Sequence, residues 1–303
     1  MSAPFAVVTV IHDSGAELRG LLDSIDRHLD PRPRVVVADS GSSDGGAALA
    51  RSRGGEVVEL AGNPGFGAGS NAAIELVSEP VTALVNPDVV LLDDGLAQLA
   101  RRALERDELA VPRLLNEDGS VQDSAHPVPG TLESLVPALL PRPLLPAPLR
   151  RRYEPWRSET PREVGWAIAA CLAARTELLR RLGPFDPAAF LFYEDMELCL
   201  RARRAAVPTV LHPDVRLRHL GGTSTARDLG ERALELKARR RREALAAQGT
   251  RALVLDDAAE AATHGLRGAA RRLAGRGGEV ELARLRALRA ARRADGRAHR
   301  RDR

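Results

Sequence analysis

An alternation of short apolar runs with amphipathic segments fills the first 108 residues and constrains the fold more than any other feature of this sequence. Runs rich in β-branched residues predict strands at 5–11, 35–38, 57–60 and 82–85. Helical spacing predicts helices around 18–25, 47–53, 72–77 and 94–106. Strands that alternate with helices are typical of the α/β class, with an open, mostly parallel sheet flanked by helices.

Three polar loops follow strands of this sheet, at 39–46, 62–71 and 86–88. Loops after parallel strands share one edge, where ligands bind in such folds. These loops lack a Gly-x-Gly-x-x-Gly dinucleotide motif and a P-loop Lys-Ser/Thr, and the chain has one lysine, Lys237. Hydride transfer to a dinucleotide and P-loop phosphoryl transfer are therefore poor interpretations.

Three carboxylates, Asp39, Asp44 and Asp88, fall in these loops. Acidic groups gathered at one edge repel each other unless a positive group lies among them. A divalent cation bridging to a substrate diphosphate would supply it. Each Asp can instead be a turn residue or a helix N-cap, and the residues alone leave both interpretations open.

A second acidic group follows the aromatic run that begins at Phe190. Glu194, Asp195 and Glu197 lie within four residues, ahead of an apolar and basic stretch. Adjacent carboxylates beside apolar surface tend to raise the pKa of one of them, which suits a general base. The alternative is an acidic first turn of a helix, stabilised by the helix dipole.

The middle of the chain differs in composition from the first 108 residues. Residues 127–161 contain nine prolines and predict a long surface loop with one short helix near 132–140. The remaining expected elements are strands at 109–115 and 164–174, a helix at 176–182, and two short strands around Pro213 within 207–219. The Gly-Gly-Thr-Ser-Thr segment at 221–225 closes this part of the chain.

Composition and length exclude several protein classes. With 44% hydrophobic residues, the chain can bury a full core, and no uncharged apolar run approaches the roughly 18–20 residues of a membrane span. The N-terminus lacks a signal-peptide pattern. Cys171 and Cys199 lack metal-ligand spacing and are interpreted as core residues in a reduced compartment. We therefore expect a cytoplasmic protein.

The C-terminal segment is strongly basic. Residues 226–303 hold 21 Lys and Arg against 11 Asp and Glu, a net charge of +10, whereas residues 1–225 carry −6. The segment has helical composition and predicts either peripheral attachment to an anionic membrane surface or a solvated extension. Nucleic acid is a poor partner, because the acidic body lacks the aromatic-basic stripe that single-strand binders use.

Five segments in order resemble the family 2 inverting glycosyltransferases of the GT-A fold, most closely their rhamnosyltransferase-like branch. The segments are 7–25, 36–46, 63–71, 85–88 and 183–201. The resemblance implies a GT-A domain over 1–225, with a nucleotide-sugar half at about 1–108 and an acceptor half at about 109–225. Residues 226–303 would form a basic helical extension.

The resemblance also implies roles for single residues. On the donor side it implies that the nucleotide-sugar meets Asp39, Asp44, the turn that ends at Asp13, and the loop that contains Gly67 and Asn71. Mg²⁺ or Mn²⁺ on the diphosphate would be held by Asp88 and His219, beside Asn86, which stands where the family has an aspartate. On the acceptor side, Asp195 would be the general base with Glu194 as its neighbour, and Trp166 would line the site.

A protein of this family would transfer a sugar, rhamnose or a similar hexose, with inversion. The donor would be a dTDP- or UDP-sugar, and the acceptor a hydroxyl of a cell-wall, polysaccharide or lipid-linked glycan. The competing hypothesis is a non-catalytic protein of the same fold that uses its basic tail to bind an anionic membrane or nucleic acid.

Overall fold

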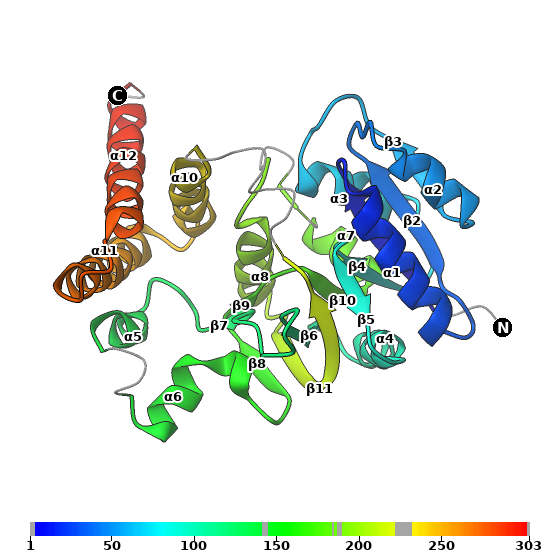
Figure 1. Cartoon of the computed structure of the whole chain (residues 1–303), viewed down its shortest axis with the longest axis horizontal. Helices are drawn as coiled ribbons and strands as arrows, with labels where there is room; N and C mark the ends of the chain where they lie inside the picture. Colours follow the sequence, from blue (N-terminus) through cyan, green and yellow to red (C-terminus); the bar gives the residue numbers. More distant parts are fainter. Residues whose placement is uncertain (1–3, 141–144, 184, 187–189, 222–231, 302–303) are drawn as a thin grey trace. The chain divides into compact units, whose positions relative to one another are not determined.

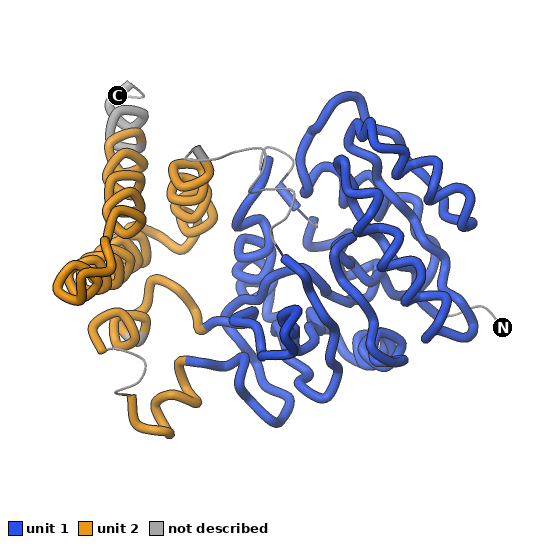
Figure 2. Tube along the Cα trace, viewed as in Figure 1, with its two compact units in different colours: residues 1–126, 154–225 blue, residues 127–153, 226–303 orange. Residues whose placement is uncertain are grey.

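A computed structural model describes residues 4–140, 145–183, 185–186, 190–221 and 232–301. The chain divides into two compact units, shown in Figure 2. Unit 1 comprises residues 1–126 and 154–225, and unit 2 comprises residues 127–153 and 226–303. Part of the proline-rich segment thus groups with the C-terminal residues.

One mixed sheet forms the centre of unit 1 (Figure 1). Its order is β3-β2-β1-β4-β10-β6-β11-β5, and β8 also pairs with β11. The strands are β1 (Phe5–Ile11), β2 (Arg34–Asp39), β3 (Glu56–Glu59), β4 (Val81–Val85), β5 (Val89–Leu91), β6 (Leu109–Leu115), β8 (Arg162–Val164), β10 (Cys171–Arg175) and β11 (Thr209–His219). A separate antiparallel pair joins β7 (Ala125–His126) to β9 (Trp166–Ala167).

The strand directions decide which loops share an edge. β1, β2, β3 and β4 pair in parallel, so the loops that follow them lie at one edge. β10 is antiparallel to β4, and Cys171 at its start lies opposite Val85 at the end of β4. The segment before β10 therefore reaches the same edge as the loops after β1, β2 and β4. The expected α/β sheet is confirmed.

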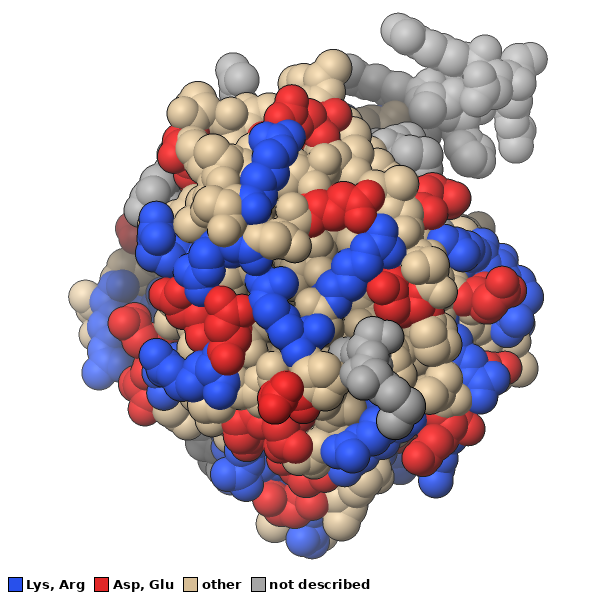
Figure 3. Space-filling model, turned by 90° about the vertical axis from the view of Figure 1, so that its right-hand side faces the viewer, with Lys and Arg blue, Asp and Glu red and all other residues tan. Residues whose placement is uncertain are grey.

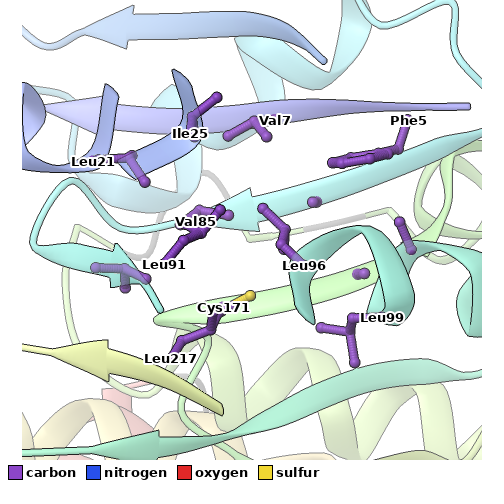
Figure 4. Close-up of a cluster of buried hydrophobic side chains, with 14 of the residues drawn as sticks. Phe5, Val7, Leu21, Ile25, Val85, Leu91, Leu96, Leu99, Cys171 and Leu217 are labelled. Carbon is purple, nitrogen blue, oxygen red and sulfur yellow. The ribbon is translucent and has the colours of Figure 1, made fainter. Parts of the chain in front are cut away.

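Helices cover both faces of this sheet. They are α1 (Gly15–His28), α2 (Gly46–Ser52), α3 (Phe66–Glu75), α4 (Gly95–Glu105), α7 (Thr176–Leu182) and α8 (Glu194–Arg204). Figure 4 shows Leu21 and Ile25 of α1 and Leu96 and Leu99 of α4 in one buried cluster with strand residues such as Val7. Gly69 of α3 instead lies against Val10, which strand alternation places on the opposite face from Val7.

Several elements differ from the sequence-based expectation. α3 begins at Phe66, inside the expected glycine-rich loop, because small residues allow the helix to start close to β1. The single strand expected at 164–174 is divided into β8, β9 and β10. The two strands expected around Pro213 are one strand, β11, whose register with β6 shifts between His212 and Arg216.

The segment 127–161 contains the short helix expected near 132–140, but it also contains two further short helices where a loop was expected. It contains η1 (Leu132–Leu135), α5 (Val136–Leu139), α6 (Ala147–Tyr153) and η3 (Pro155–Arg157). Residues 141–144 of this segment and 222–225 of the Gly-Gly-Thr-Ser-Thr segment lie outside the described residues. Proline is tolerated in the first turn of a helix, as at the start of α5 and η3, so a high proline content did not exclude short helices.

Unit 2 gathers three long helices in its C-terminal part: α10 (Arg232–Ala246), α11 (Thr250–Leu273) and α12 (Glu279–Arg301). Buried ion pairs connect them. Arg241 of α10 donates to Asp256 of α11 at 2.7 Å, and His264 of α11 lies 2.7 Å from Glu281 of α12. None of the helices in the described ranges has the length and apolarity that crossing a bilayer requires.

The side of the molecule that faces right in Figure 1 belongs to unit 1. Figure 3 shows basic and acidic side chains interspersed over this side. Many of unit 1's arginines are paired: Arg53 bridges Asp23 and Asp26, and Arg34 pairs with Glu56. This face therefore lacks the uniform basic surface that attracts nucleic acid.

Leu99→Ala tests the core. Leu99 is fully buried between α4 and the sheet, so truncation should lower the free energy of unfolding by about 2–5 kcal/mol through the cavity it leaves. Leu76→Ala is the matched control, because Leu76 is 41% exposed and its truncation should cost about 0.5 kcal/mol or less. Urea unfolding measures both values, and equal losses would contradict the packing described.

Candidate active site

Hydrogen bonds between backbone N–H groups and side chains join the loops after β1 and β2. The N–H of Ser43 donates to Asp13 Oδ1 at 2.7 Å, and the N–H of Asp13 donates to Ser42 Oγ at 3.1 Å. Within the loop after β2, the N–H of Ser42 donates to Asp39 Oδ1 at 2.9 Å. The bond from Ser43 lowers the pKa of Asp13. Asp13 has a φ of 46°, in the left-handed region that a non-glycine residue rarely adopts. Asp13 and Asp39 therefore lie together at the expected edge of the sheet.

Asp44 joins the starts of two helices. Its Oδ2 accepts the N–H of Gly15 at 2.6 Å, and its Oδ1 accepts the N–H of Gly46 at 3.0 Å. Gly15 begins α1 and Gly46 begins α2. Each bond satisfies an N–H that the helix leaves without an internal partner. The capping interpretation of Asp44 describes its contacts, and its place in a nucleotide site stays a prediction.

α3 begins in the second glycine-rich loop and contacts the segment ahead of the acidic motif. Gly67 is buried in the first turn of α3. The side-chain amide of Asn71 both donates to the carbonyl of Phe185 at 2.9 Å and accepts its N–H at 3.2 Å. Asn71 therefore fixes the backbone ahead of the acidic motif, a role that its sequence context did not indicate.

Gly65 lies against the backbone of Phe190. Its φ is 94°, and a Cβ at this position would lie 2.0 Å from the carbonyl oxygen of Phe190. The same carbonyl accepts the N–H of Phe66 at 3.2 Å. A glycine is required here on both counts. The donor-side loop and the chain leading to Asp195 are thus in direct backbone contact.

Two consecutive aromatic residues adopt left-handed conformations just before α8. Phe192 has a φ of 72° and Tyr193 a φ of 62°. Conformations of this kind cost of order 1–3 kcal/mol each and cluster at functional sites. Here the turn starts α8 so that Asp195 lies in its first turn, with its Oδ2 3.3 Å from the N–H of Ala169, which donates to it.

Burial shifts the acidity of Asp195. The surrounding protein withdraws solvent from the carboxyl and raises its pKa to about 6, although the N–H groups of Met196 and Ala169 donate to the carboxylate and oppose the rise. Desolvation disfavours the charged form of an acid. A carboxylate with this pKa accepts a proton more readily than an ordinary aspartate does.

The neighbouring carboxylates have different surroundings. Glu194 is buried at the start of α8. Glu197 pairs with Arg201 one turn further on, at 2.8 Å. Arg201 also donates to the carbonyls of Leu182 and Gly183. Glu197 therefore helps to hold α8 against the end of α7, whereas Asp195 accepts the N–H of Ala169 beside the sheet edge.

Residues 169–170 connect the acidic motif to the turn after β4. The N–H of Ala169 donates to Asp195, and the carbonyl of Ala170 accepts the N–H of Asn86 at 2.8 Å. Asn86 lies in the same turn as Asp88. Two adjacent residues thus place Asp195 and the Asn86–Asp88 turn at one edge.

Asp88 and His219 lie together, as expected. His219 Nε2 is 3.4 Å from Asp88 Oδ1, and Asp88 Oδ2 accepts the N–H of Gly221 at 3.1 Å. On its other side, His219 Nδ1 lies 2.8 Å from Gln122 Oε1. No sequence pattern marks Gln122 as a partner of His219, because the two residues lie 97 positions apart in the chain.

The donor set at this point fits a divalent cation. A carboxylate oxygen and an imidazole nitrogen are ligands for Mn²⁺, which accepts both oxygen and nitrogen donors. The residues that the structure describes contain no group of three or more His, Cys, Asp and Glu side chains able to hold a metal. Two protein ligands suffice where substrate phosphates supply the others.

Trp166 is packed rather than open. It is 9% exposed, stacks on His126 with ring centroids 4.3 Å apart, and lies 6.1 Å from Tyr193. The ring of His126 also contacts Trp156, with ring centroids 5.9 Å apart. Because Tyr193 directly precedes Glu194, this aromatic group borders the acidic motif. Contact between Trp166 and an acceptor stays a prediction.

Two comparisons with known proteins concern the sequence of the chain. The model of glycosyl transferase family 2 matches residues 6–164. An N-acetylglucosaminyl-diphospho-decaprenol L-rhamnosyltransferase of Mycobacterium tuberculosis is 30% identical over 249 residues, covering 75% of this chain and 80% of that protein.

Two solved structures are similar in fold. The mannosyltransferase PcManGT from Pyrobaculum calidifontis, in complex with GDP-Man and Mn²⁺, has a TM-score of 0.59 at 15% identity, covering 96% of this chain and 86% of that one. Glucosyl-3-phosphoglycerate synthase from Mycobacterium tuberculosis, in complex with Mn²⁺, UDP and glucosyl-3-phosphoglycerate, has a TM-score of 0.51 at 17% identity, covering 80% and 78%. These likenesses show the GT-A fold.

Gly65→Ala tests the contact between the donor-side loop and the acidic motif. The added Cβ would collide with the Phe190 carbonyl, so amide hydrogen exchange at 190–195 should become faster and the free energy of unfolding should fall. Gly62→Ala is the matched control. Gly62 has a φ of 66° but an added Cβ would meet nothing within 4 Å, so this variant carries the backbone strain alone. Identical exchange at 190–195 in both variants would contradict the contact.

Proposed function

Because the chain belongs to glycosyl transferase family 2, we propose that it transfers rhamnose or a similar hexose from a dTDP- or UDP-sugar to a hydroxyl of a lipid-linked glycan. The observation that carries the mechanism is Asp195, whose pKa is raised to about 6 and whose carboxylate is held at the edge that receives the donor. The choice of sugar and acceptor rests on the rhamnosyltransferase relative, whose name gives a diphospho-decaprenol acceptor.

Asp195 acts as the general base. Its carboxylate takes the proton of the acceptor hydroxyl as the oxygen attacks the anomeric carbon. The bond between that carbon and the diphosphate oxygen breaks, and the nucleoside diphosphate leaves with the electron pair. A single displacement of this kind inverts the anomeric configuration. Base catalysis contributes about 10²–10⁴-fold, and positioning of the two substrates contributes the larger share.

The donor occupies the edge formed by the loops after β1, β2 and β4. Asp39 meets the pyrimidine base, with the turn at Asp13 beside it. The first turn of α3, with Gly67, lies where the nucleotide and sugar pass. The contact of Gly65 with Phe190 brings this loop next to the segment that leads to the general base, so that donor and acceptor meet at Asp195.

Asp88 and His219 would hold Mg²⁺ or Mn²⁺ beside the donor diphosphate, and Asn86 lies in the same turn as Asp88. When bound, the cation offsets the negative charge that develops on the leaving diphosphate. Two observations support this: the acid and imidazole lie 3.4 Å apart, and the two solved structures described above, which share the fold, contain Mn²⁺. Asn86 carries no charge, so Asp88 is the acidic ligand of the turn.

Unit 2 attaches the enzyme to the inner face of the cell membrane. Its C-terminal residues carry a net charge of +10. It also exposes apolar side chains of a kind that enter the membrane interface: Leu132, Leu139, Leu140, Leu149, Val254, Leu266, Leu273 and Val280. A basic surface with exposed apolar residues suits an anionic leaflet, where a lipid-linked acceptor would be found.

Asp195→Asn tests the base. The amide preserves the size of the side chain but cannot take a proton, so turnover should fall by about 10²-fold or more while donor binding is retained. The measurement is release of dTDP or UDP from a panel of donors with Mg²⁺ or Mn²⁺, alongside donor titration by calorimetry. Near-normal turnover in the variant would show that another group is the base. A wild-type protein that neither binds nor cleaves any donor would favour the non-catalytic alternative.

Replacing three arginines of α12 tests the membrane attachment. They are exposed in the structure: Arg286, Arg289 and Arg293. Each basic residue near an anionic surface contributes about 1 kcal/mol, so replacing all three by Ser should weaken binding roughly a hundredfold at low salt. Sedimentation with phosphatidylglycerol vesicles measures it. The matched control replaces Arg101, Arg106 and Arg204, exposed residues of unit 1, and removes the same charge. Equal binding by the two triple variants would refute a specific role for unit 2.

A further inference from the structure

We propose that Gln122 is a positioning residue, which fixes the proton of the His219 ring on Nδ1 and so presents Nε2 to a divalent cation beside Asp88. The inference deepens the proposed function and rests on it. It concerns a side chain that lies outside the motifs of the sequence, on the turn that continues β6.

The hydrogen bonds of this turn have one consistent direction. Ser120 Oγ donates to Asp118 Oδ1 at 2.6 Å, because a carboxylate can only accept. Ser120 Oγ in turn accepts the Nδ2 hydrogen of Asn116 at 2.9 Å. This bond orients the Asn116 amide, so that Asn116 Oδ1 accepts the Nε2 hydrogen of Gln122 at 3.1 Å. The Gln122 amide is therefore oriented with its oxygen toward His219.

The orientation of Gln122 decides the tautomer of His219. Gln122 Oε1 lies 2.8 Å from His219 Nδ1 and can only accept, so Nδ1 carries the proton. In the neutral ring, Nε2 then has a lone pair, and it faces Asp88 Oδ1 at 3.4 Å. Two acceptors converge on one point, which suits a cation between them. An outer partner of this kind fixes the orientation of metal-binding histidines in general.

The backbone makes this turn a fixed support. Asn116 N–H donates to the Ser120 carbonyl at 2.8 Å, and Gln122 N–H donates to the Leu114 carbonyl at 2.9 Å. Gly119 takes the left-handed conformation of the turn, with a φ of 81°. The parallel register pairs Leu115 with Arg218, the residue before His219. Pairing of β6 with β11 thus sets the hairpin beside the histidine.

Gln122→Met and Gln122→Glu test the inference in the full-length protein. Met keeps the length of the side chain and removes the acceptor, so binding of Mn²⁺ should weaken by about 10–100-fold. Glu keeps an acceptor oxygen toward His219 but cannot donate to Asn116, so its affinity should lie closer to the wild-type value than that of Gln122→Met. Gln98→Met is the matched control, because Gln98 lies on α4 and bonds to Asp94. Titration with Mn²⁺ alone, followed by electron paramagnetic resonance, measures the affinities.

Nitrogen NMR of the histidine rings gives a second readout that needs neither metal nor substrate. The His219 signals are assigned as those that are absent from the spectrum of His219→Ala. His219 should carry its proton on Nδ1 in the wild type and in Gln122→Glu. In Gln122→Met it should shift toward the Nε2-protonated form that an unconstrained ring favours. An unchanged tautomer, or unchanged Mn²⁺ affinity, in Gln122→Met would overturn the proposal.

The outcomes separate this inference from the proposed function. A protein that binds no Mn²⁺ yet releases nucleoside diphosphate would overturn the role of Gln122 and leave sugar transfer intact. A protein whose Mn²⁺ affinity depends on Gln122, but which cleaves no donor, would support the positioning role and overturn the proposed activity.

Discussion

The site depends on one backbone junction, at Ala169 and Ala170. The N–H of Ala169 donates to Asp195, and the carbonyl of Ala170 accepts from Asn86. These residues reach the donor edge because β10 runs antiparallel to β4, so the start of β10 lies beside the end of β4. A parallel β10 would place them at the opposite edge of the sheet. The reversal of one strand therefore brings the segment that contacts Asp195 to the edge formed by the loops after β1, β2 and β4.

The charges at this edge are balanced locally. Asp13, Asp39 and Asp44 accept N–H groups of the loops and helix starts, so they do not require a cation to offset their repulsion. Asp88 Oδ1 and His219 Nε2 are the two acceptors that converge on one point and suit a metal ion. Burial raises the pKa of Asp195 to about 6. The carboxylates of this edge therefore differ in their surroundings.

The strands, the helices of the donor half and the shared edge could be predicted from the sequence, because local hydrophobic periodicity encodes them. The resemblance placed Asp88 with His219, and the structure brings them together. The remaining features depend on contacts between distant residues. Gly65 meets Phe190, Asn71 holds Phe185, and Gln122 meets His219, and no local pattern marks any of these pairs. The short helix expected near 132–140 is present, whereas the helices α6 and η3 were missed because proline content masked them.

The pH dependence of donor turnover tests the role of Asp195 most directly. A base must have lost its proton, and the pKa of Asp195 is raised to about 6 by burial. The rate constant kcat/KM, which reports the free enzyme, should therefore rise with pH through about 6 and level off above it. An ordinary aspartate has a pKa of about 3.9, so a profile that is already level at pH 5 would contradict the assignment of Asp195 as the buried base.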